Sequence, residues 1–200
     1  MPKYGLKGIY AAKYVNTNGT VTYTDVTKVG DAMQVNLELR NAEGRLYAED
    51  ALAEYMRALT GGTISLGVKY IPDAAQKLLF GLHEKTRSVT YTPVGSSSTA
   101  TTTATSHSIG SSDEGVYVGV AFYAPSLVDS NKKYDCVFIK KAMFGPPSMS
   151  IQTKGENITF DTPTTTGEFL ASDDASHEFY EVFVADDENE AKAWVQAVFS

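Results

Sequence analysis

The 200-residue sequence predicts an all-β fold, a sandwich or barrel, with one short internal helix and a C-terminal helix. Short segments in which apolar and polar residues alternate recur along the chain, separated by turn residues, and this is the pattern of half-buried strands. Two other segments instead combine helical spacing of apolar residues with helix-terminal residues. The length fits a single domain, residues 1–200, with ample chain to bury a core.

The first strands are expected at residues 8–14 and 20–24, because Asn18-Gly19 between them is a strong two-residue hairpin signal. In residues 33–40, apolar side chains alternate with polar ones, which gives one strand an apolar and a polar face. Its polar members are Gln34, Asn36, Glu38 and Arg40. A turn at 41–44 is expected to lead into a return strand at 45–48. Residues 64–70 alternate again, and Gly61-Gly62 before them is interpreted as a turn.

The second half predicts both helices and the remaining strands. Pro72-Asp73 and Gly81 bracket an apolar segment, and proline at the start with glycine past the end is typical of a helix. Strands are predicted at 116–123, 134–144 and 178–184. Residues 149–160 show strand-like alternation on both sides of a turn at 154–157, which predicts a hairpin. The last helix begins near 186–188, where acidic residues favour the positive end of the helix dipole.

Residues 96–112 contain 12 serines and threonines among 17 positions. Such a segment cannot bury enough apolar surface to offset the entropy of ordering it. A flexible surface loop is therefore predicted at about 95–115, and loops of this length are often functional.

The charge distribution argues against nucleic-acid binding. Residues 1–154 hold 16 basic and 13 acidic side chains, whereas 155–200 hold Lys192 against 11 carboxylates. A chain this acidic at one end is a poor binder of nucleic acid. The carboxylates either form a solvated face or present a surface that repels DNA. No apolar run approaches the roughly 20 residues that cross a bilayer, and no signal peptide is apparent. The single Cys136 is expected to be buried and inert.

No catalytic or cofactor motif is recognised, so the protein is expected not to be an enzyme and to carry no cofactor. His83, His107 and His177 are isolated and lack metal-ligand spacing. The acidic run at 186–190 lacks the glycine and distant glutamate of a calcium loop, and helix capping explains it better. Phosphate-binding and nucleophile-elbow motifs do not occur.

Several segments, in order along the chain, resemble the major tail proteins of long-tailed, non-contractile bacteriophages. The hairpin at 149–167 has the Gly155 turn and the Thr162-Pro163 to Gly167 exit of that family. Four other segments also resemble elements of this family. They are the opening strand at 4–10, the Tyr-Ala-acidic element at 46–50, the glycine-closed helix at 71–81 and the aromatic-containing helix at 193–198. Glu49 departs from the family's commonest spacing. The resemblance favours extended chain at 50–59, where helix propensity alone favours a helix.

The resemblance implies a structural virion protein whose hexameric rings stack into the tail tube, the conduit for DNA ejection into the host. Each subunit would lend strands to a shared inner barrel, and DNA would pass its lumen without specific binding. The implied partners are further copies of the chain and the tape measure, tail terminator and distal tail proteins. No membrane association is implied. The protein would be made in the host cytoplasm and function in the virion.

Two surfaces are candidates for this function. If the apolar face of 33–40 packs inside the sandwich, Gln34, Asn36, Glu38 and Arg40 point into the lumen; the competing arrangement places them on the outer surface. The Ser/Thr-rich loop is a candidate inter-ring contact through Ser97, Thr101, Thr105 and Ser111. The alternative function is a carbohydrate-binding β-sandwich, because aromatics also build sugar platforms, although their alternate strand positions suit packing first.

Overall fold

The computed structural model describes residues 3–49, 51–111, 114–128, 131–148 and 162–200, and it confirms the predicted all-β class with two short helices. The elements are as follows, in chain order. They are β1 (Lys7–Thr17), β2 (Thr20–Gly30), β3 (Ala32–Ala48), β4 (Ala51–Val68), α1 (Asp73–Phe80), β5 (His83–Tyr91), β6 (Ala100–Ser108), β7 (Tyr117–Val128), β8 (Asn131–Phe144), β9 (Thr164–Leu170), β10 (Tyr180–Ala185) and α2 (Glu188–Ala197).

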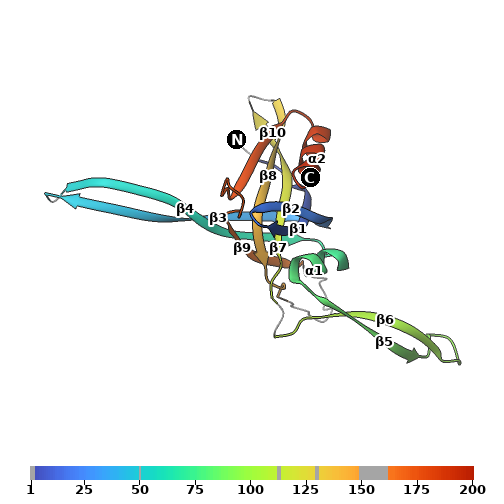
Figure 1. Ribbon diagram of the computed structural model, residues 1–200. Coiled ribbons are helices and arrows are strands. Elements are labelled where there is room, and N and C mark those ends of the chain that lie inside the picture. Colours follow the sequence, from blue (N-terminus) through green and yellow to red (C-terminus); the bar gives the residue numbers. More distant parts are fainter. Residues whose placement is uncertain (1–2, 50, 112–113, 129–130, 149–161) are drawn as a thin grey trace, which may run out of the picture.

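The main sheet is antiparallel and open, with strand order β2-β1-β7-β8-β9-β4-β3. β8 is the branch point of this sheet. Its residues 134–139 pair with β10, whereas Lys141–Phe144 pair with β9. The sheet therefore divides at Lys140, and the β9-β4-β3 part can turn across the β7–β8 layer (Figure 1).

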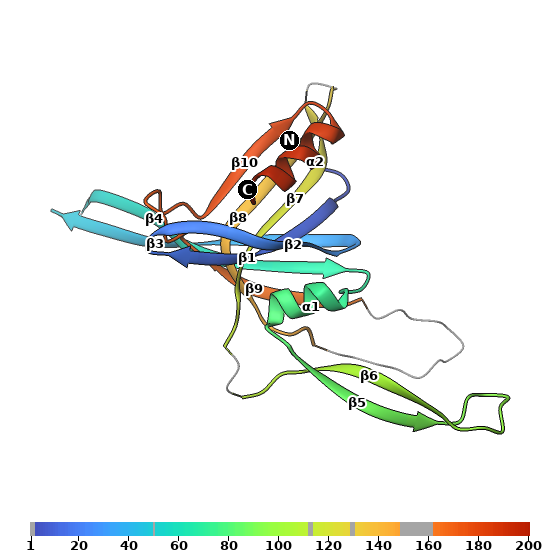
Figure 2. The same ribbon diagram turned by 45° about the vertical axis from the view of Figure 1, so that its right-hand side comes forward.

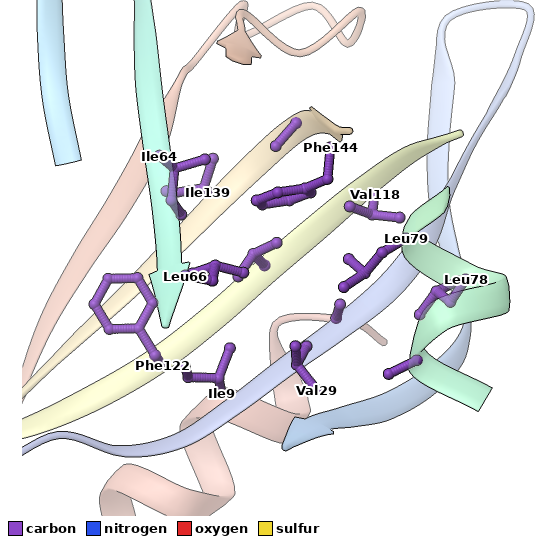
Figure 3. Packing of buried hydrophobic residues seen from close by; sticks show 14 of the residues in the cluster. Ile9, Val29, Ile64, Leu66, Leu78, Leu79, Val118, Phe122, Ile139 and Phe144 are labelled. Carbon is purple, nitrogen blue, oxygen red and sulfur yellow. The ribbon is translucent and has the colours of Figure 1, made fainter. Parts of the chain in front are cut away.

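Both faces of β7 and β8 are buried, which explains why their sequences are continuously apolar. On one face, Val120 and Phe122 of β7 pack with Val137 and Ile139 of β8 in the larger core cluster. That cluster also takes in Ile9 of β1, Ile64 and Leu66 of β4, Leu79 of α1 and Phe144 at the end of β8 (Figure 3). On the other face, Val195 of α2 and Phe199, which follows the helix, cover Ala121 and Phe138.

The helix termini follow the predicted chemistry. Gly81 ends α1 in the left-handed region with φ 63°, and its N–H bonds the carbonyl of Lys77. Asp187 is the N-cap of α2 and accepts hydrogen bonds from the N–H groups of Asn189 and Glu190. The acidic run at 186–190 is thus a helix cap, as predicted.

Two turn predictions in the β3–β4 region were wrong. Residues 41–44 continue β3, because they pair residue by residue with 56–59 of β4, and the chain reverses only after Ala48. Gly61-Gly62 lies inside β4, at the β-bulge where the register shifts between Arg40 and Asn41. A side chain at Gly62 would meet the Glu38 carbonyl oxygen at 2.0 Å, so close strand packing requires glycine there. Extended chain at 51–59 is confirmed.

Strands β5, β6 and β9 were not predicted from the sequence. β6 falls within the segment predicted to be a flexible surface loop, and it pairs along its whole length with β5. The predicted hairpin at 149–160 lies outside the described residues, except for its exit at 162–167, which leads into β9.

Candidate assembly surfaces

The predicted lumen residues lie on one exposed polar face that continues across three strands. In the pairing of β3, β4 and β9, Asn36 lies beside Ser65 and Thr166, and Glu38 lies beside Thr63 and Glu168. Gln34 and Arg40 extend the same face along β3, and all four predicted residues are exposed. The structure therefore brings Gln34, Asn36, Glu38 and Arg40 together, as their spacing of two residues required.

Hydrogen bonds link the side chains of this polar face. Arg40 pairs with Glu168 at 3.1 Å, the Asn36 amide donates to Glu38 at 3.1 Å, and the Ser65 and Thr166 hydroxyls lie 2.9 Å apart. Two carboxylates stand against one guanidinium, so the face has a net charge of −1. It is polar and weakly acidic, and its short β4 and β9 side chains offer hydroxyls but no cationic cluster that would hold phosphate.

The opposite face of β3 is only partly covered. Val35 and Leu37 pack against the larger core cluster, as predicted. Met33 and Leu39 remain 56% and 47% exposed, contrary to the expectation of a fully internal face. Met33 and Leu37 line a groove of about 420 Å³ whose other wall includes Phe122 and Val137.

The outer half of β3 and β4 forms a two-stranded arm, residues 41–59, that projects from the body of the molecule (Figures 1 and 2). The register gives this arm two unlike faces. One face carries Arg45 over the ring of Tyr55, paired with Glu43. The other is mostly apolar: Leu46 and Met56 are 58% and 74% exposed among small residues, and the exposed Glu54 lies opposite Leu46 on the same face. The small residues of that face are Ala42, Gly44 and Ala58.

The β5–β6 hairpin is a second projecting ribbon, and it corrects the predicted flexible loop for Ala100–Ser108. The hydroxyls of Thr90 and Thr101 lie 3.0 Å apart across the strands. Threonine is a good strand former. The loop was nevertheless predicted because the segment lacks large apolar residues. Of the predicted inter-ring residues, Thr101 and Thr105 lie in β6, Ser97 lies before it and Ser111 after it. All four are exposed.

The loop between β9 and β10 is tied down by consecutive lysines of β8. Lys141 is buried, its Nζ lies 2.7 Å from both carboxylate oxygens of Asp173, and the rings of Tyr14 and Tyr117 lie 5.3 and 4.6 Å away. The hydrogen bond from Lys141 holds the pKa of Asp173 below its usual value. Lys140 pairs with Glu178. Sequence reasoning missed this cluster because its members are distant along the chain.

The remaining candidate groups are the cysteine and the histidines. Cys136 is fully buried, and burial raises the pKa of its thiol to about 11. His177 contacts the Ser172 carbonyl, and His107 lies 3.8 Å from Glu84. Within the described ranges, no three His, Cys, Asp or Glu side chains are arranged to hold a metal ion. No helix in the described part of the chain is long and apolar enough to span a bilayer.

No protein-family model and no curated protein sequence matches the chain.

Proposed function

We propose that the protein is a self-assembling tube subunit, whose hexameric rings stack into a phage tail tube that conducts DNA to the host. The observation that supports this proposal best is the β3–β4 arm. A two-stranded ribbon is at best marginally stable alone in water, and this one leaves Leu46 and Met56 uncovered by any described residue. Exposed apolar patches mark sites of contact with other molecules, so this one supports an arm that packs against a neighbouring subunit.

The open sheet supports the same proposal. β2 and β3 end the strand order, and they are 11 and 17 residues long. Long unpaired edges invite aggregation in a monomer, whereas closing the sheet across subunits removes them. A barrel closed from several subunits is wide enough to enclose a channel.

The polar face around Glu38 suits the wall of such a channel. Six copies of a face with net charge −1 would place about six negative charges around the lumen, well within the ~8 Å screening length of passing phosphates. Repulsion would limit adhesion of DNA. In this arrangement the Arg40–Glu168 pair leaves no guanidinium free to bind a phosphate.

The test is negative-stain electron microscopy of the purified full chain, together with light scattering over a range of concentrations. Rings or tubes with a central channel are expected. A protein that stays monomeric at high concentration and moderate salt, with no polymer on ageing, contradicts the proposal. Glycan binding by that monomer would favour a carbohydrate-binding module. The exposed Tyr47 and Tyr55 lie on the arm, apart from Tyr70 and Tyr91, so these four tyrosines do not form a single sugar-binding platform.

A further inference from the structure

A groove of about 610 Å³ lies between α1 and the bulged part of β2. Its apolar lining comes from both elements and from the chain on either side of the β5–β6 hairpin. The apolar lining residues are Val26, Ala74, Leu78, Leu82 and Val116. Lys13 and Lys77 stand on its rim together with Asp25.

A β-bulge in β2 presents the exposed apolar side chain of this groove. The register passes from Ala11 opposite Thr27 to Lys13 opposite Thr24, so Asp25 and Val26 together oppose Ala12. Asp25 has φ 58°, in the left-handed region that a non-glycine residue adopts at some cost in free energy. The result is that Val26, a β-branched residue, is 48% exposed over the groove. Bulges are common at sheet edges, where they re-aim a side chain.

The β3–β4 arm has the shape and chemistry to fill this groove. Its mostly apolar face presents Met56 and Leu46 from a ribbon whose Gly44 and Ala58 allow close approach, and Glu54, opposite Leu46, adds one carboxylate to that face. The arm, residues 41–59, holds four carboxylates and two arginines, a net charge of −2. The charged lining residues of the groove, Lys13, Lys77 and Asp25, sum to +1, and Lys13 is exposed and makes no ion pair with any described residue, so the net charges of groove and arm are opposite in sign.

The arm cannot reach the groove of its own molecule. It points away from α1 in both views of the ribbon (Figures 1 and 2). Each copy thus carries one arm and one groove on different parts of its surface. A contact of this kind is heterologous, and repeated from copy to copy it closes a ring or continues as a filament.

We infer that the apolar face of the arm, centred on Met56, docks in the α1–β2 groove, at Val26, of a second copy of this chain. The inference rests on the proposed self-assembly and specifies which two surfaces meet. The second groove, beside Met33, is the competing receptor. Its charged lining residues, Lys3 and Asp135, are paired with each other at 3.3 Å, so it offers the acidic arm no free cation.

The experiment is cross-linking between two full-length variants mixed under assembly conditions. Met56→Cys protein is mixed with Val26→Cys protein and treated with a short bismaleimide, and the heterodimer is quantified by electrophoresis and mass spectrometry. Cys136 is fully buried and does not compete. Because docking raises the effective thiol concentration to about millimolar, micromolar mixtures should give at least about tenfold more heterodimer than the control pair. The control pair is Tyr55→Cys with Val26→Cys, since Tyr55 lies on the charged face of the arm.

Charge insertion gives an independent readout. Met56→Glu and Val26→Glu should each raise the critical concentration for assembly by at least about tenfold, because each loses a buried apolar contact and buries a carboxylate. Circular dichroism checks that each subunit stays folded. If Met56→Cys instead cross-links to Met33→Cys, or if both glutamate variants assemble normally, the inference is wrong and self-assembly stands. If the wild-type chain never self-associates, the inference and the proposed function both fail.

Discussion

The pairing of Lys141 with Asp173 leads to a prediction in which the two partners are not equivalent. The Lys141 side chain is 11% exposed, whereas that of Asp173 is 39% exposed. Asp173 also accepts a hydrogen bond from the Asn16 amide at 3.2 Å. An unpaired Asp173 could therefore be rehydrated, but an unpaired Lys141 ammonium would remain buried between two tyrosine rings.

This difference in exposure sets the expected free energies of unfolding. Lys141→Met keeps the apolar stem and removes the charge, so it should cost about 1 kcal/mol for the lost hydrogen bonds and cation–π contacts, partly offset by relief of desolvation. Asp173→Asn keeps the shape but leaves a buried charge without its anion. Removing one partner of a buried ion pair lowers the free energy of unfolding by about 3–5 kcal/mol. Because Lys141 keeps its contacts with the two tyrosine rings, the loss expected for Asp173→Asn is about 3 kcal/mol.

Urea unfolding of the dilute subunit at pH 7 measures both values. The pH dependence provides the control. The folded-state pKa of Asp173 lies below its ordinary value of 3.8, so its contribution to stability is present above that value and disappears as the pH falls through the folded-state pKa. Wild type and Asp173→Asn should therefore converge in strong acid. A Lys141→Met variant as unstable as Asp173→Asn, or a difference that persists in strong acid, would refute the reasoning.

Three further outcomes are expected. Phe169→Ala removes a fully buried ring and should cost about 3–5 kcal/mol in urea unfolding; a loss under 1 kcal/mol would show that the site collapses around the cavity. The Cys136 thiol, with its pKa raised by burial to about 11, should react with a disulfide reagent at pH 8 only after unfolding, and rapid labelling of the native protein would contradict this. Glu38→Lys, on the candidate lumen face, should leave tubes intact but slow genome ejection from assembled tails; unchanged ejection would remove the lumen assignment.

Local signals in the sequence predicted most of the elements correctly. Asn18-Gly19 is a two-residue turn with φ of 53° and 85°, conformations that favour asparagine and glycine, so its hairpin could be identified without tertiary information. The same holds for Gly81 and Asp187, because helix ends are satisfied by residues adjacent in sequence. The alternation at 33–40 likewise fixes which side chains share a face, because the strand period is two.

The failures lie where pairing partners decide the structure. Residues 41–44 contain turn-forming types, yet they continue β3 because 56–59 provide a ladder for every backbone group. The segment around Thr101–Thr105 buries no hydrophobic core of its own, and its backbone pairing with β5 orders it instead. Neither partner could be read from local propensity.

The sequence by itself determined the fold class, both helices and the polar face of β3, since these depend on spacing and on neighbouring residues. The tertiary structure alone decided where the sheet divides at Lys140, that residues 41–59 project as an arm, and that Asp25 turns Val26 outward. It also decided that Lys141 meets Asp173 between two tyrosine rings. The reason is physical: these features depend on contacts between strands that are remote in the chain, and such contacts follow from packing the whole sheet.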